Sequence, residues 1–271
     1  MVMVYDGLAQ DTISLPEFHA AVDALQAPKY GVEYLQACAV LLTRLANNKD
    51  LFWDMIAACQ DQTALARIFS PPQSFTLGIG ETHYLRINFW LPKDNHSEYA
   101  EHQRELYAYQ LAHNHDFRFM TVGYFGSGYQ TDVYEMDAAR VRGEAGEVVE
   151  LKRHQRLQLH PGRVIYFAPY DDVHVQHEPQ DISISINLIF IGEERLREQL
   201  LIDVAQSKVI EVPQISNLSR LITTMEIAAL CGNQDTAVLL QQLGEHRNPR
   251  VAQAGQRLAQ AMQPAALAAA A

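Results

Sequence analysis

The stretch His113-Asn-His-Asp-Phe-Arg-Phe-Met-Thr-Val-Gly123 decides how the rest of this sequence is interpreted. Its aromatic and β-branched residues predict a β-strand that ends at the glycine. Because side chains alternate between the two faces of a strand, we expect the imidazoles of His113 and His115 on the same face. Neutral imidazole is a common metal ligand, so this pair is a candidate part of a metal site.

A third imidazole, His174, follows the segment Pro161-Gly-Arg-Val-Ile-Tyr-Phe-Ala-Pro169. This segment combines a tight turn, an apolar strand and a proline bend, which would bring His174 onto a strand next to the pair. His177 is the alternative third ligand, because the length of the turn before it is not fixed by the sequence. Three imidazoles on one face leave coordination positions open, and both zinc and iron bind such a set.

Many short strands separated by Gly, Pro and Asp surround these segments, which indicates an antiparallel sandwich or barrel. The expected strands are residues 82–90, 113–123, 129–136, 148–151, 156–159, 164–168, 174–176 and 182–190. Residues 123–129 are rich in glycine but lack a lysine and a following helix, so they predict a β-turn rather than a phosphate-binding loop.

Both ends of the chain predict helices. Ser14-Leu-Pro-Glu17 is a capping box, and residues 30–46 place their apolar side chains on one helical face. After residue 193 we expect helices at 196–205, 217–230, 236–243 and 249–262. The predicted organisation is therefore an N-terminal helical segment (1–70), a β-barrel (71–192) and a C-terminal helical segment (193–271). The last helices either form a HEAT-like helical hairpin, cover the barrel or form a dimer interface.

The order of these residues resembles the two sequence motifs of the cupin superfamily: an H-x-H strand with a downstream glycine, then Pro-Gly, an apolar strand, a proline and a histidine. The resemblance covers residues 75–190, under half of the chain. The glutamate that usually follows the second histidine is absent, since residues 116–119 are Asp-Phe-Arg-Phe. Three-histidine cupins, such as the cysteine dioxygenase-like thiol dioxygenases, also lack it. Residues 113–135 and 174–187 resemble their first motif and last two strands.

The resemblance implies a fold that is mainly β with flanking α, namely a cupin-type antiparallel β-barrel (double-stranded β-helix) with N-terminal and C-terminal helical segments. It also implies a mononuclear non-haem Fe(II) dioxygenase in which His113, His115 and His174 bind the metal and O2 reacts with a small chelating, amino-acid-like substrate. Two alternatives stay open: a Zn or Mn isomerase or hydrolase, and a non-catalytic binding or scaffold protein. Residues 71–192 contain no cysteine, so the cysteine–tyrosine crosslink of animal cysteine dioxygenases is not expected.

Two further residues are candidates for contact with the substrate. Arg86 shares a strand face with Asn88 and Trp90, and a buried cation needs a partner, so we expect it to bind a carboxylate unless this face is solvated. Tyr134 is the candidate phenol near the metal. The alternatives are the other tyrosines of these strands: Tyr124, Tyr129 and Tyr166. Residues that share the face of His113 and line either a pocket or ordinary core are Phe117, Phe119 and Thr121.

Composition narrows the class of protein. Hydrophobic residues make up 48% of the 271 residues, enough for a substantial core. The formal net charge of -11 argues against a nucleic-acid partner and favours a soluble protein that acts on a small molecule. No apolar run is long enough to span a membrane. The three cysteines are far apart in the sequence, which fits a reducing cytoplasm, and a homodimer is one arrangement that the sequence leaves open.

Overall fold

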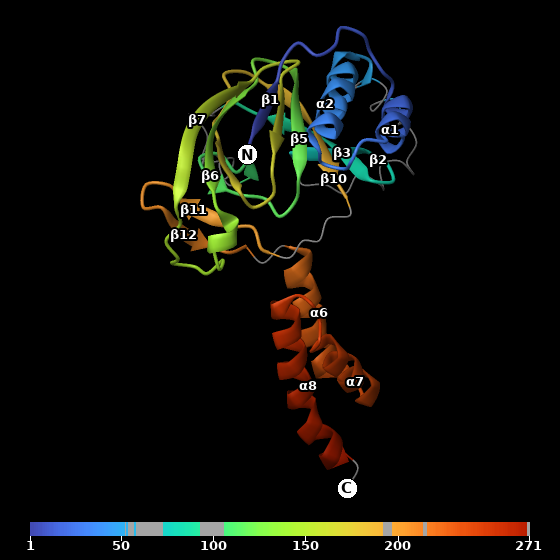
Figure 1. The fold of residues 1–271 in the computed structure, drawn as a ribbon, viewed down its shortest axis with the longest axis vertical. Helices are drawn as coiled ribbons and strands as arrows, with labels where there is room; N and C mark the ends of the chain where they lie inside the picture. Colours follow the sequence, from blue (N-terminus) through green and yellow to red (C-terminus); the bar gives the residue numbers. More distant parts are fainter. Residues whose placement is uncertain are drawn as a thin grey trace.

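The structure is a computed structural model that describes residues 1–51, 53, 57, 73–92, 106–191, 197–213 and 216–269. Two six-stranded antiparallel sheets form its centre (Figure 1). The first sheet has the order β1 (Met3–Tyr5), β8 (Val164–Phe167), β5 (Phe119–Phe125), β10 (Ser183–Phe190), β3 (His83–Trp90) and β2 (Ser74–Ile79). The second has the order β12 (Lys208–Glu211), β11 (Leu201–Asp203), β4 (Ala112–His113), β9 (Asp172–Gln176), β6 (Tyr129–Met136) and β7 (Leu151–Leu159).

The two sheets are held together by side chains. Trp90, Phe119 and Ile165 of the first sheet belong to the same buried cluster as Val133 and Leu157 of the second. The expected mainly β fold is confirmed, but a closed barrel is not observed: within the described residues, each sheet remains open at both edges. Closure requires hydrogen bonds between edge strands, whereas these sheets meet through apolar faces.

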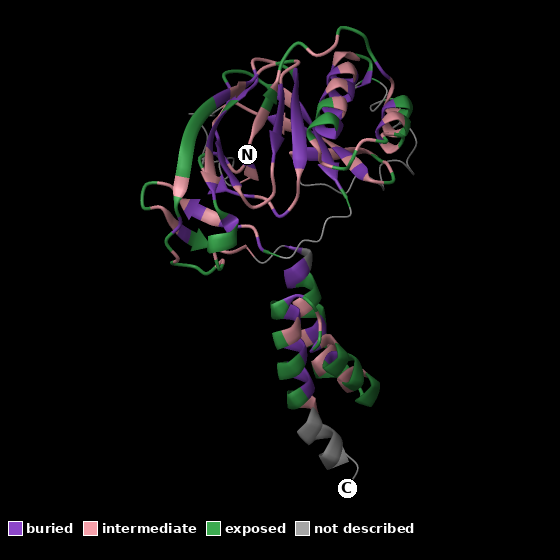
Figure 2. Ribbon diagram, in the orientation of Figure 1, coloured by how far each residue is buried: buried purple, intermediate pink, exposed green. Residues whose placement is uncertain are grey.

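Two helices, α1 (Leu15–Asp23) and α2 (Val32–Asn47), pack on the outer face of the first sheet. The predicted capping box is confirmed, since Ser14 accepts a hydrogen bond from the backbone of Glu17 while Glu17 accepts one from the backbone of Ser14. Figure 2 shows the buried residues concentrated in the strands and on the sides of these helices that face the sheet. The N-terminal segment is not wholly helical, because residues 3–5 form β1 and extend the sheet beside β8.

Three strand and helix predictions were wrong in detail. The strand expected at 113–123 is divided into β4 and β5 by a bend. The helix expected at 196–205 is absent from the described residues 197–205, because 201–203 form β11 between β4 and β12 and bury Ile202. The strand expected at 148–151 reduces to one bridge between Val148 and Lys208, and β7 runs onward from 151 to 159.

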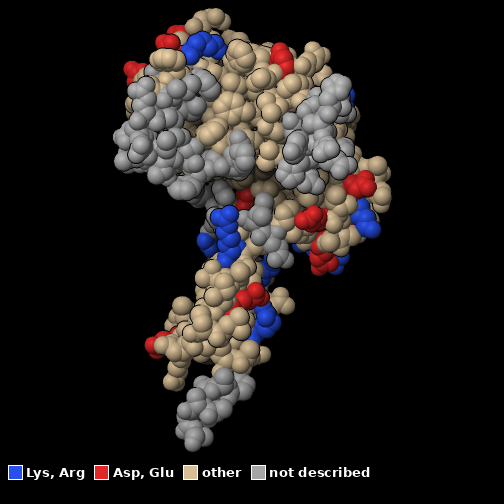
Figure 3. Space-filling model, turned by 180° about the vertical axis from the view of Figure 1, so that it is seen from behind, with Lys and Arg blue, Asp and Glu red and all other residues tan. Residues whose placement is uncertain are grey.

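The C-terminal helices α6 (Asn217–Cys231), α7 (Gln234–Leu243) and α8 (Pro249–Ala269) pack on one another and project from the β-sheets (Figure 1). They do not cover the sheets as one prediction proposed. Buried Glu198 links them to the β unit, accepting hydrogen bonds from Ser219 and, at 2.7 Å, from Arg250. Figure 3 shows lysine and arginine side chains gathered where the helices leave the β unit. The domain limits and the homodimer remain predictions.

No helix among the described residues is long and apolar enough to cross a membrane. The cytoplasmic location remains a prediction. The short 3-10 helix η1 (Ala138–Arg140) follows β6 and completes the described elements of the β unit.

A pair of histidines, the partly exposed His19 and the fully buried His83, fastens α1 to the first sheet. His19 Nδ1 lies 2.8 Å from His83 Nε2, and His83 Nδ1 lies 3.4 Å from the carboxylate of Asp23. Glycines make room for the rings: a Cβ at Gly80 would lie 2.4 Å from His83 Cε1. The partners of His83 therefore come from a helix about sixty residues away in the sequence. Burial, with repulsion from His19, lowers the pKa of His83 to about 4.

This pKa predicts a pH-dependent loss of stability. The unfolded chain binds a proton at His83 near pH 6.5, whereas the folded protein binds it only near pH 4. The stabilisation is therefore complete above about pH 6.5 and declines as the pH falls towards 4, by about 2 kcal/mol between pH 7 and pH 5. Urea unfolding at both pH values checks this: His83→Gln should show a smaller change than the wild type. His160→Gln, which alters a half-exposed histidine, should change like the wild type. An equal change in His83→Gln and wild type would refute the assignment.

Candidate metal centre

Three imidazoles converge between the sheets. The Nε2 atom of His174 lies 3.1 Å from Nε2 of His113 and 3.1 Å from Nε2 of His115. Each residue offers a ligand nitrogen, and these three nitrogens lie within 4.8 Å of one another. Among the described residues, no other group of three or more His, Cys, Asp or Glu meets this condition. The structure thus brings together the three residues that the sequence predicted as ligands.

The local backbone places the rings by a route that the sequence did not predict. His113 ends the two-residue strand β4 and pairs with His174 on β9. His115 lies outside any strand, in the bend before β5. The side chain of Asn114 holds this bend, donating to the Tyr170 carbonyl at 2.9 Å and accepting from the Leu200 amide at 2.7 Å. The imidazoles of His113 and His115 therefore lie together as predicted, but because of this bend and not because side chains alternate along a strand.

The protonation state suits a metal. His113 Nδ1 lies 2.9 Å from the Leu111 carbonyl, which can only accept, so Nδ1 carries the proton and Nε2 presents a lone pair. Burial lowers the pKa of His113, and it lowers that of His174 well below the usual value, with His113 adding to the effect. Both rings are therefore neutral near pH 7, which is the form that binds metals.

The spacing also suits a metal. Two nitrogens ~2.1 Å from a common ion are ~3.0 Å apart at a right angle and ~3.4 Å apart at a tetrahedral angle. The two observed separations of 3.1 Å lie nearer the first value. In the tautomer in which all three Nε2 atoms present lone pairs, a positive charge between them offsets their mutual repulsion. The donor set therefore fits a divalent ion held on one face.

Aromatic side chains surround the triad. The ring of His115 lies 4.6 Å from that of Phe117 and 5.0 Å from that of Phe119, while Phe167 lies 4.7 Å from His174. Phe119 and Phe167 stack on each other at 4.9 Å. Phe117 and Phe119 were predicted to share the face of the histidines, and the structure places both against His115. Apolar walls exclude water and strengthen electrostatic interactions at the site.

Arg86 lies on the inner face of the first sheet. It pairs across β3 and β10 with Asn187, which pairs with Thr121 on β5, and residues opposite one another share a sheet face. Phe119, two residues from Thr121, lies on that face too and contacts His115. The Nε atom of Arg86 is buried without a hydrogen-bond partner among the described residues. Burial lowers the pKa of Arg86, although arginine remains protonated at neutral pH.

The structure does not bring Tyr134 to the triad. Val133 is the residue opposite His174, and alternation along β6 turns Tyr134 to the other face, where its ring stacks on His154 at 4.9 Å. Its proposed role as a phenol near the metal is therefore corrected. Tyr129 lies on the inner face instead, buried against Trp90 at 4.5 Å, and burial raises its pKa. Sequence alternation offered this distinction, but only the register of β6 with β9 fixes which parity faces inward.

The remaining candidates lie elsewhere. The His177 ring binds Asp132 and Gln110, so His174 rather than His177 joins the triad. Asp116 accepts a hydrogen bond from the side chain of Gln199 at 3.1 Å. The other two tyrosines lie on the outer side of the first sheet: Tyr124 donates to the carbonyls of residues 48 and 49, and Tyr166 accepts from Arg118. Sequence reasoning missed the supporting residues Asn114 and Phe167, because neither belongs to a metal motif.

No family model and no curated protein matches this chain. Solved structures to which it is similar include hydroquinone 1,2-dioxygenase from Sphingomonas sp. TTNP3, at 9% identity over 46% of this chain and 68% of that one, with a TM-score of 0.30. A second is the DMSP lyase DddQ from Ruegeria pomeroyi, at 8% identity over 73% of this chain and 82% of that one, with a TM-score of 0.29. A third is the ribosomal oxygenase YcfD from Escherichia coli, at 13% identity over 42% of this chain and 24% of that one, with a TM-score of 0.26. Similarity at this level assigns no activity to the chain.

Proposed function

We propose that this protein is a mononuclear Fe(II) oxygenase of the cupin type that binds its metal through His113, His115 and His174. The observation that carries the proposal is the convergence of three Nε2 atoms, two of the separations being 3.1 Å, inside an aromatic enclosure. Three neutral ligands on one face leave the charge of the ion undiminished and the opposite positions open. Such a centre suits a substrate that itself chelates iron.

When bound, iron(II) supplies the redox chemistry through which electrons of an organic substrate reach O2. In dioxygenation both oxygen atoms enter the substrate, which provides all four electrons, so no separate reductant is required. The protein's own residues position and shield the reactants. Phe117, Phe119 and Phe167 keep water from the face on which the histidines converge. The Leu111 carbonyl holds the proton of His113 at Nδ1 and so keeps Nε2 available.

The environment of Arg86 favours an anionic substrate. Its side chain is partly exposed, but its Nε atom is buried on the sheet face that carries Phe119 and has no hydrogen-bond partner among the described residues. A buried N–H without a partner is costly, and a carboxylate supplied by the ligand would remove that cost by accepting from Nε. Together with the demand for chelation, this points to a small carboxylic acid with a second donor atom, as in an amino acid. Tyr129 also lies on the inner face. Because burial raises its pKa, it is a neutral phenol that can donate a hydrogen bond.

Metal analysis and oxygen uptake test this function. Protein purified without oxygen should contain about one iron per chain, and it should consume O2 in proportion to substrate when small chelating carboxylates are screened. Arg86→Gln should retain the iron and raise KM about 10- to 100-fold, because a charge-assisted hydrogen bond is lost. Stoichiometric zinc or manganese without O2 uptake would favour an isomerase or hydrolase. Absence of bound metal after exposure to iron, zinc and manganese would contradict the proposal and favour a non-catalytic role.

A further inference from the structure

The position of His113 depends on little regular structure. Strand β4 has two residues, and only His113 pairs with β9, opposite His174. The residues before it adopt unusual backbone conformations: Ala108 has φ 52° and Gln110 has φ 59°. Left-handed backbone costs a residue other than glycine roughly 1–2 kcal/mol, so contacts from elsewhere must hold this segment.

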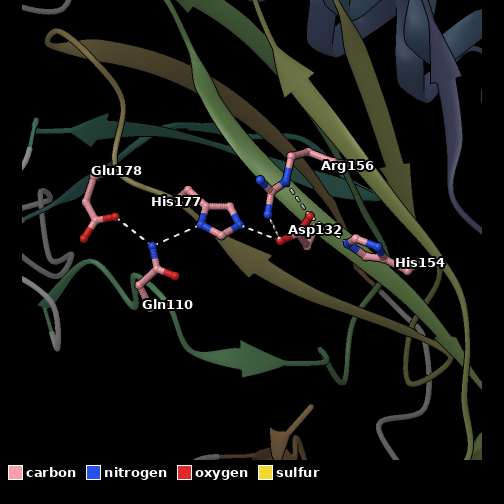
Figure 4. Close-up of polar contacts among 6 residues, drawn as sticks. All are labelled: Gln110, Asp132, His154, Arg156, His177 and Glu178. Atoms are coloured by element: carbon pink, nitrogen blue, oxygen red, sulfur yellow. Dashed lines mark hydrogen bonds and ion pairs between the residues drawn. The ribbon is translucent and has the colours of Figure 1, made fainter. Parts of the chain in front are cut away.

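Gln110 supplies those contacts. Its backbone N–H donates to the Gln176 carbonyl at 2.9 Å, which ties the segment to the end of β9. Its side-chain amide donates to Nδ1 of His177 at 3.0 Å and to the carboxylate of Glu178 at 2.8 Å. Figure 4 shows Gln110 and Glu178 on one side of the His177 ring and Asp132 on the other. The segment that leads to His113 is thereby joined to the segment that follows His174.

Asp132 fixes the orientation and tautomer of His177. The Nε2 atom of His177 lies 2.8 Å from Oδ2 of Asp132, and Arg156 donates to both oxygens of this buried carboxylate. The Arg156 hydrogen bonds hold the pKa of Asp132 far below its usual range, so Asp132 accepts and His177 Nε2 carries the proton. His177 Nδ1 is then an acceptor, which is what the amide of Gln110 requires. His154 binds the same carboxylate at 2.9 Å but is half exposed and has no contact with Gln110.

The last step reaches the metal ligand. Gln110 precedes Leu111, and the Leu111 carbonyl accepts the Nδ1 proton of His113 at 2.9 Å. We propose that His177, held by Asp132, is a positioning residue that orients His113 within the triad through Gln110 and the Leu111 carbonyl. The inference rests on the proposed function, because it assigns His177 to the support of that metal site. Outer contacts of this kind typically change metal affinity 10- to 100-fold.

Cobalt(II) binding to the apoprotein tests the proposal. The visible absorption of bound Co²⁺ reports ligand geometry, and competition with a chelator gives Kd. Gln110→Ala and His177→Ala should each weaken Co²⁺ binding about 10-fold and alter the spectrum. The double variant should be no weaker than either single variant, because both break one link. His177→Asn, which keeps an acceptor near Nδ1, should recover part of the loss.

His154→Ala is the matched control, since it removes another histidine from the same carboxylate, and its Kd should stay within about twofold of wild type. Melting of each apoprotein separates altered geometry from loss of fold; if His177→Ala does not fold, the exposed Gln110 decides alone. Co²⁺ binding that requires His113 but is unchanged in Gln110→Ala and His177→Ala would overturn this inference and leave the proposed function intact. Failure of the wild type to bind Co²⁺ would overturn both.

Discussion

The His113→Ala/His115→Ala double variant is expected to lose its metal, with occupancy falling from about one ion per chain to below about a tenth. Two of three ligands disappear, and one imidazole does not hold a divalent ion against buffer and chelator. The aromatic wall offers no replacement, because Phe117, Phe119 and Phe167 have no donor atoms. Elemental analysis after dialysis against a weak chelator measures the loss.

His154→Ala/His160→Ala is the control for that variant. It removes the same number of imidazoles from half-exposed positions outside the triad, and it should keep the metal content of the wild type. Full occupancy in His113→Ala/His115→Ala would refute the triad. Equal loss in both double variants would show that the metal is bound nonspecifically by histidines.

Gly128→Ala is expected to destabilise the fold by about 3 kcal/mol or more. Gly128 has φ +75°, and a Cβ there would lie 1.8 Å from the carbonyl oxygen of Leu159, which is backbone and has little room to move. The cost therefore combines left-handed strain with displacement of the end of β7. Urea unfolding gives the change in free energy.

Gly162→Ala separates the two contributions. Gly162 has φ +81°, yet nothing lies within 4 Å of the position that its Cβ would take. It should lose only the conformational part, about 1 kcal/mol. Equal losses at the two positions would contradict the steric explanation. In the glycine-rich segment 123–129, which also contains Gly128, the Ser127 N–H donates to the carboxylate of Asp181 at 2.8 Å. This amide is therefore not free to bind a phosphate.

Much of the fold was predictable because its signals are local. The alternation of β-forming residues predicted 129–136 without error, and the helix starts predicted after Ser14 and at residue 249 are confirmed by the structure. Where the signal was ambiguous, tertiary pairing decided. Residues 201–203 fit a helical pattern as well as a strand, and the free edge of β4 selected the strand.

The sequence by itself determined that His113 and His115 are candidate metal ligands, and among its eleven histidines it left His174 and His177 as the alternatives for the third. Only the tertiary structure decided that Tyr129 rather than Tyr134 faces inward, that His177 binds Asp132 and Gln110 rather than joining the triad, and that Arg86 lies on the inner face of the first sheet. Each of these depends on strand register or on contacts between residues far apart in the chain. A local pattern shows that faces alternate, but the partner strand decides which face is buried.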